Sequence, residues 1–155
     1  MNERPQEAIL IRRLRFSTTL LGQLEDKFMS TPIDTVNQLA DAINRGDLEA
    51  ALALYEMDAV LVVRPGTLAR GSMELRTSLA QFIQLKPTLR TQTQSVVEVD
   101  DIALYVGRWT LQGVDPSGQG IAMGGESSDI LRRQRDSRWL IAIDNPWGAQ
   151  ILEQR

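Results

Sequence analysis

The stretch that decides the fold reads DILRRQ at 129–134, then a short polar turn, then WLIAIDNPWG at 139–148. Both segments alternate or run apolar as β-strands do, so the stretch predicts a hairpin of two long strands. Each strand also carries a carboxylate, Asp129 in the first and Asp144 in the second. A charge inside such a strand must face water, find a partner or sit in a cavity where its ionisation is useful.

Upstream of this hairpin the pattern is helical at first. Capping residues followed by apolar residues at helical spacing predict three helices, which begin at Thr31, Asp47 and Ser72. The second helix is short and includes Tyr55, and the third is closed by Pro87.

Extended segments make up most of the remaining chain. One short strand, 59–63, separates the second and third helices, and an antiparallel meander follows the third helix at 88–99, 102–113, 120–134 and 138–144. Helices followed by a long curved sheet form an α+β layout.

One domain is expected, because 155 residues suffice for a single hydrophobic core. We assign this domain to 31–149, with an N-terminal helical arm at 1–30 and a C-terminal tail at 150–155. Leucines near heptad spacing over 6–28 favour an arm that packs on its own domain or on a partner subunit. A basic membrane-surface helix is disfavoured by three acids in the arm, Glu7, Glu25 and Asp26.

The chain contains no Cys and no His, which limits the kinds of catalytic and metal-binding site that it can form. Thiolate nucleophiles, cysteine-ligated metals, Ser-His-Asp triads and histidine-based metal sites are all excluded. Acid–base chemistry is left to carboxylates and to the two tyrosines, Tyr55 and Tyr105. The adjacent acids Asp100 and Asp101 read as a hairpin turn rather than as metal ligands. No metal and no cofactor is expected.

The formal charge of −3 and the pI near 5.0 give no general attraction to nucleic acid or to anionic membranes. No apolar run has the length of a membrane span, and the opening residues lack the pattern of a signal peptide. We therefore expect a cytoplasmic protein without nucleic-acid or membrane partners.

Several motifs carry a family resemblance: GDLEAALALY at 46–55, DAV at 58–60, GTLARG at 66–71, GRWTLQG at 107–113, LRRQ at 131–134 and NPWG at 145–148. In this order they resemble the nuclear transport factor 2-like superfamily, in particular its ketosteroid isomerase-like and polyketide cyclase-like (SnoaL-like) branch. The resemblance covers about residues 31–149.

The resemblance implies a cystatin-like cone, in which three helices pack in a strongly curved antiparallel sheet and leave a pocket at the open end. It also implies a homodimer that pairs through the outer face of the sheet. The polar strand 88–99, which is rich in Thr and Val, is compatible with such pairing.

The resemblance also allows catalytic positions to be compared one by one. The place of the proton-shuttling Asp of ketosteroid isomerases, after the first strand, is held here by Val63 or Arg64, neither of which is a base. The oxyanion-stabilising Tyr of the first helix falls near Leu39. The second oxyanion donor, a protonated Asp, corresponds to Asp129. Only this third position is carried over, so steroid isomerisation is not expected.

Asp129 is the first candidate for a catalytic residue. It shares a strand face with Ser127 by period two, and a carboxyl group in an apolar cavity can act as a general acid or hydrogen-bond donor near neutral pH. The alternative is a structural Asp that pairs with a neighbouring side chain such as Arg108.

The other candidates are residues that could contact a ligand. Tyr105 and Trp109 lie four apart on one strand, so they form either an aromatic wall for a planar ligand or part of the core. Asp144 and Trp147 either edge the pocket or end the last strand. Tyr55 is the remaining residue that we expect to contact a ligand.

Two functions remain open on this sequence. The first is a cone-fold domain that binds a small hydrophobic or aromatic molecule, either as a binding site alone or as a cofactor-independent isomerase-like or cyclase-like enzyme that uses Asp129. The second is a non-catalytic, dimeric binding or interaction domain whose pocket is filled by packing. Whether the protein is an enzyme is left undecided by its residues alone.

Overall fold

The computed structural model of the protein describes residues 30–152. The helix expected at 6–28 and the last three residues of the expected tail lie outside the described residues. The cone domain begins at Thr31, and the following description concerns this unit. None of its helices is long and apolar enough to cross a membrane.

Helix α2 (Pro32–Arg45) confirms the expected start and end. The Thr31 hydroxyl accepts a hydrogen bond from the Asp34 backbone N–H at 3.1 Å, and the Asp34 carboxylate accepts one from the Thr31 N–H at 2.9 Å. This reciprocal pair satisfies two backbone donors that would otherwise be free at the helix start. Gly46 ends the helix with a φ of 70°, a conformation that suits glycine.

The other two helices differ in part from the expectation. Helix α3 (Leu48–Leu52) is capped by Asp47, as predicted, but it ends before Tyr55, which belongs to the first strand. Helix α4 (Gly71–Gln84) is not capped by Ser72. The carboxylate of Glu74 instead accepts a hydrogen bond from the backbone N–H of Arg70 at 2.8 Å, so an acid in the first turn replaces the expected hydroxyl cap.

Six strands form one sheet in the order β2-β1-β6-β5-β4-β3. Their bounds are β1 (Tyr55–Arg64), β2 (Thr67–Arg70), β3 (Thr88–Val99), β4 (Ile102–Val114), β5 (Gly120–Arg133) and β6 (Trp139–Asp144). The sequence did not predict β2, because four residues are too few to show a pattern. It also missed that β1 and β6 pair in parallel, whereas the other pairs are antiparallel.

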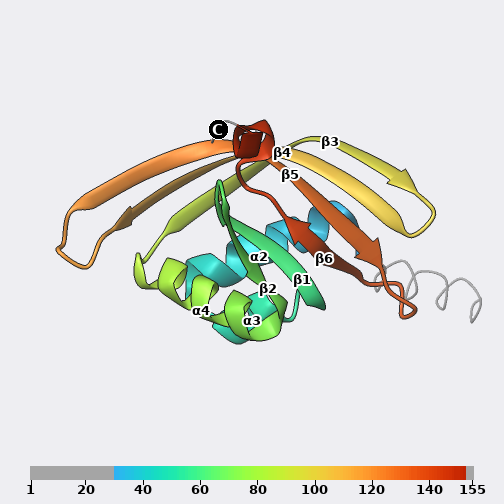
Figure 1. Ribbon diagram of the computed structural model, residues 1–155, viewed down its shortest axis with the longest axis horizontal. Helices are drawn as coiled ribbons and strands as arrows, with labels where there is room; N and C mark the ends of the chain where they lie inside the picture. Colours follow the sequence, from blue (N-terminus) through green and yellow to red (C-terminus); the bar gives the residue numbers. More distant parts are fainter. Residues whose placement is uncertain (1–29, 153–155) are drawn as a thin grey trace, which may run out of the picture. The chain divides into compact units, whose positions relative to one another are not determined.

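The sheet curves around the helices, and β3, β4 and β5 arch over α2 and α4 (Figure 1). The α+β cone that the sequence predicted is thereby confirmed. Large side chains from both layers fill the core between helices and sheet, among them Leu75, Tyr105, Leu131 and Ile141, each at most 1% exposed. A 3-10 helix, η1 (Gly148–Leu152), extends the ordered chain beyond the expected domain end and packs against β5.

Strand β6 changes face along its length, and this change positions the site. Ile141 is 1% exposed and pairs with the buried Leu131, whereas Ile143 is 42% exposed and pairs with Ile130. Strict alternation would place Ile141 and Ile143 on the same face. A register shift lies between their two partners on β5 and turns the strand, so that Asp144 faces the inside of the cone.

Candidate functional site

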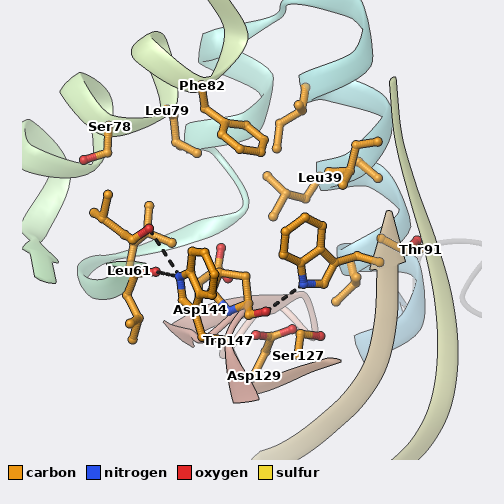
Figure 2. Close-up of a pocket in the computed structure, with 18 of the residues that line it drawn as sticks. Leu39, Leu61, Ser78, Leu79, Phe82, Thr91, Ser127, Asp129, Asp144 and Trp147 are labelled. Carbon is orange, nitrogen blue, oxygen red and sulfur yellow. Dashed lines mark hydrogen bonds between the residues drawn. The ribbon is translucent and has the colours of Figure 1, made fainter. Parts of the chain in front are cut away.

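A cavity of about 290 Å³ lies between the helices and the concave side of the sheet. Its lining is mostly apolar. Leu39 of α2 and Leu79 and Phe82 of α4 face it from the helical side, and Figure 2 shows them across the cavity from Asp129 and Ser127. This volume is near the lower end of the range of small-molecule sites, roughly 300–1,000 Å³, and suits a molecule of one or two rings.

The ionisable groups of the cavity gather at one end, where β1, β5 and β6 meet. Asp129 and Ser127 come from β5, Asp144 comes from the end of β6, and Tyr55 comes from the start of β1. The Tyr55 hydroxyl donates a hydrogen bond of 2.5 Å to Asp144 Oδ2. Four of the residues that the sequence singled out are therefore brought together, although they are as much as 89 positions apart.

Asp129 is held in place by its own strand and by the chain that leaves β6. Its Oδ1 accepts a hydrogen bond of 2.8 Å from the backbone N–H of Asn145, and the Ser127 hydroxyl also bonds to its carboxyl group. Arg108, the partner considered from the sequence, points away and pairs with Glu126 at 3.2 Å. Arg108 is therefore not the partner of Asp129, and a structural role for this hydrogen-bonded acid stays an alternative to catalysis.

Burial, together with the nearby charge of Asp144, raises the pKa of Asp129 to about 8, although the hydrogen bonds from Asn145 and Ser127 oppose this shift. Burial also raises the pKa of Asp144 to about 6, although the hydrogen bond from Tyr55 opposes this shift. The two carboxyl groups interact, so their proton belongs to the pair. At pH 7 the pair therefore shares about one proton and carries one negative charge, and the hydrogen bond from Tyr55 favours the charge on Asp144.

Two tryptophans form the aromatic wall of the cavity. Trp109 and Trp147 meet edge to face at 89°, with ring centroids 6.4 Å apart. Trp109 Nε1 donates to the Pro146 carbonyl at 2.7 Å, and Trp147 Nε1 donates to the carbonyls of Val62 at 3.1 Å and Val63 at 3.2 Å. Both N–H groups are thus bound to the backbone, which leaves the rings to meet a ligand.

A tight turn after β6 fixes the position of Trp147. The Asn145 amide donates to Ser128 Oγ at 3.0 Å and to the Gly148 carbonyl at 3.1 Å, and its oxygen accepts from the Trp147 N–H at 3.3 Å. A Cβ atom at Gly148 would lie 2.6 Å from the Glu126 carbonyl oxygen. The motif NPWG at 145–148 is therefore explained by the geometry of this turn.

Tyr105 does not contribute to the site as predicted. It is 1% exposed and belongs to the core cluster, and it is not among the described residues that line the cavity. Its ring lies over Gly107 on the same strand, and its hydroxyl is 3.3 Å from Thr93 Oγ1. Tyr105 and Trp109 do share the inner face, but only Trp109 reaches the cavity.

Two polar lining residues were missed, Ser78 of α4 and Thr91 of β3. Ser78 precedes Leu79 on a helix whose inner face was judged by its leucines, so nothing in the spacing marked it. Thr91 belongs to a strand in which polar residues are common. Among the described residues, no group of three or more acidic side chains is placed to hold a metal ion.

Comparison with known protein families and solved structures shows which proteins this chain is similar to. The model of the SnoaL-like domain matches residues 36–141. A ketosteroid isomerase-like protein from Erwinia carotovora atroseptica is 20% identical, with a TM-score of 0.64 over 71% of this chain and 87% of that one. A nuclear transport factor 2-like superfamily protein from Salmonella enterica serovar Typhimurium is 15% identical, with a TM-score of 0.67 over 83% of this chain and 92% of that one.

A third similar structure is a nuclear transport factor 2-like protein of unknown function from Shewanella oneidensis, 20% identical, with a TM-score of 0.60 over 72% of this chain and 92% of that one. Identities this low show a shared fold and nothing finer. No curated protein sequence matches the chain significantly. The family model, however, covers most of the cone from α2 to β6, and the chain therefore belongs to the family of SnoaL-like domains.

Proposed function

We propose that this domain binds one small hydrophobic or aromatic molecule in the cavity, with the polar end of the ligand at the acid pair of Asp129 and Asp144. The observation that carries the proposal is the arrangement of the lining. Apolar side chains surround a space of about 290 Å³, and the ionisable groups lie together at one end of it. Such a pocket orients an amphipathic ligand in a single direction.

The second part of the proposal is that the acid pair catalyses a reaction of the bound molecule. Asp129 holds a proton near neutral pH and can donate it, whereas Asp144 is ionised and can accept one. Two carboxyl groups whose surroundings separate their pKa values form a general acid and base in one site. The pair would serve a cofactor-independent isomerase-like or cyclase-like reaction, in which a proton leaves one atom of the substrate and another arrives elsewhere.

A bulky side chain in the cavity tests the binding part. Ser78 lines the cavity, whereas its neighbour Thr77 is exposed on the same helix. We expect Ser78→Trp to weaken the binding of small aromatic compounds by about tenfold or more, because the indole takes the space of the ligand. Thr77→Trp should leave binding unchanged. The measurement is a thermal-shift screen of aromatic and polyketide-like compounds followed by calorimetry, and equal affinities in the two variants would contradict the proposal.

Asp129→Asn tests the catalytic part once a compound is turned over. Asparagine keeps the shape of the side chain but cannot transfer a proton, so turnover should fall by roughly 10²- to 10⁴-fold while ligand affinity changes little. Unchanged turnover would exclude Asp129 as the proton donor. The absence of turnover with every bound compound would favour the second function, a non-catalytic binding domain.

We also propose that two copies of the chain pair through the outer face of the sheet. An apolar row crosses this face on four paired strands and consists of Val97, Leu104, Ile130 and Ile143. Val97 is 60% exposed and Ile143 is 42% exposed. A row of this kind is unusual on a surface that only meets water.

Light scattering tests this pairing at micromolar concentration. The wild type should show twice the mass of the 17.4 kDa chain, and Val97→Glu should shift it to the monomer because a buried charge would have no partner. Met73→Glu is the control, since Met73 is 83% exposed on α4, a helix that packs on the inner rather than the outer face of the sheet. A monomeric wild type would refute the dimer.

A further inference from the structure

The described lining of the cavity holds acidic side chains but no basic one. Among the described residues, the ionisable side chains that line the cavity are Asp129, Asp144 and Tyr55, and no Lys or Arg lines it. Two arginines of strands β4 and β5 form ion pairs outside the cavity: Arg108 pairs with Glu126 and Arg132 pairs with Glu56, each at 3.2 Å. A negative charge enclosed by apolar side chains is costly to leave without a partner.

The aromatic lining has the properties that favour a positive charge. The rings of Trp109, Trp147 and Tyr55 line the same cavity as the two acids. The N–H groups of both tryptophans are bound to backbone carbonyls, so these rings offer a ligand their π-systems rather than hydrogen-bond donors. The negative face of an aromatic ring attracts cations, and the attraction grows when the site is shielded from water.

From this combination we infer that the cavity binds a lipophilic amine in its protonated form, with the ammonium group at Asp144 and the apolar body against the helices. This inference rests on the proposed binding function and names the chemical class of the ligand. A carboxylate or phosphate ligand would meet like charge, and the part of the lining that the structure describes has no basic side chain to offset it. A neutral ligand would gain hydrogen bonds but would leave the charge of the acid pair uncompensated.

The shape of the lining agrees with this orientation. Leu39, Leu79 and Phe82 face the acids from the helical side, as Figure 2 shows, so an amine with one or two rings can place its rings there and its nitrogen at the sheet. Oδ2 of Asp144 already accepts the Tyr55 hydroxyl, which orients the carboxylate. Helices α2 and α4 contribute no ionisable group to the lining.

Binding of the amine should depend on pH in a defined direction. The groups that face Asp144 are Asp129 and Tyr55, and burial holds the pKa of Tyr55 well above its ordinary value, so the tyrosine stays neutral. Lowering the pH from 7.5 to 5 protonates Asp144 and removes the charge that the ammonium group requires. Affinity for the amine should therefore fall over this range, and affinity for a neutral analogue should not.

Three compounds that share one ring system test the inference: 2-naphthylmethylamine, 2-naphthalenemethanol and 2-naphthoic acid, which are a cation, a neutral molecule and an anion at pH 7. Calorimetry with the full chain should give an affinity for the amine about tenfold or more above that for the alcohol, and no measurable binding of the acid. An alcohol that binds as tightly as the amine, or an acid that binds at all comparably, would overturn the inference.

Asp144→Asn supplies the second measurement, because asparagine can still accept the Tyr55 hydrogen bond. The preference for the amine over the alcohol should disappear in this variant, and it should persist in Asp58→Asn, which removes an exposed acid of β1. A persistent preference in Asp144→Asn would overturn the inference. If the variant does not fold, the pH dependence of amine binding to the wild type is the test. An affinity for the amine that does not change between pH 5 and 7.5 would overturn the inference.

The two proposals fail in different ways. Suppose that none of the three naphthalene compounds binds, but that a neutral compound from the wider screen binds and loses affinity in Ser78→Trp. The amine inference is then wrong and the binding function stands. If no compound of any charge binds, the binding function itself is wrong.

Discussion

The melting temperature of this protein is expected to fall as the pH rises from 5 to 9, and Asp129→Asn is expected to remove most of that fall. The folded state raises the pKa of Asp129 to about 8 and that of Asp144 to about 6, whereas both acids return to ordinary values near 4 in the unfolded chain. The folded state therefore binds protons more tightly than the unfolded state does.

The sign of the effect follows from this difference. The stability that these protons contribute is fully present below about pH 4, and it is lost as the pH rises through 6 and 8, because the buried acids must then ionise in a cavity whose described lining has no basic side chain. A pKa shift of this size changes the free energy of unfolding by an amount on the order of several kcal/mol. Asparagine stays neutral at every pH, so the stability of Asp129→Asn relative to the wild type should increase from pH 5 to about pH 8 and level off above it.

Thermal denaturation followed by circular dichroism across this range provides the measurement. Asp58→Asn is the matched control, since it removes an acid from the exposed side of β1 and should change the slope very little. A wild type whose melting temperature is independent of pH, or rises steadily toward pH 9, would show that Asp129 is not buried as a neutral acid.

Gly107→Ala is expected to destabilise the protein strongly, although it adds a single methyl group. A Cβ atom at Gly107 would lie 2.6 Å from two atoms of the Tyr105 side chain, and real Cβ atoms do not approach other atoms so closely. The ring of Tyr105 is enclosed in the core, at 1% exposure, and has no room to withdraw. Forcing extra atoms into such a core costs about 1–3 kcal/mol and occasionally more.

Gly120→Ala is the control for this substitution, because Gly120 lies in the neighbouring strand β5 and nothing is within 4 Å of its added Cβ atom. Urea denaturation of the two variants should give a much lower free energy of unfolding for Gly107→Ala than for Gly120→Ala. Equal values would mean that Tyr105 can move aside, and the close packing of its ring over Gly107 would then be in doubt.

Local features of the sequence predicted much of the fold because their causes are local. The start of α2 depends on the side chains of Thr31 and Asp34, which lie three residues apart, and its end depends on the freedom of Gly46 to adopt a positive φ. Strands β3, β4 and β5 lie close to their expected bounds because alternation is visible over more than ten residues. The four-residue strand β2 offered no such signal.

The candidate site was predictable only in part. Period two placed Asp129 on the same face as Ser127 and Leu131, and the structure buries all three on the inner face of β5. The same rule placed Tyr105 and Trp109 on one face, but it could not tell which of them would reach the cavity. The curvature of the sheet decides that, since the ring of Tyr105 folds back over Gly107 while Trp109 is drawn to the turn at Pro146.

What the sequence determined by itself is the position of the long helices and strands and the inward acid of β5, since both follow from spacing along the chain. The tertiary structure alone decided that this acid has a charged neighbour. Asp144 enters the cavity because β6 is inserted between β1 and β5 and changes face after Ile141, and Tyr55 reaches it because β1 begins earlier than its pattern suggested. Strand pairing brings distant residues into contact and shifts their register, and no spacing within one segment records either event.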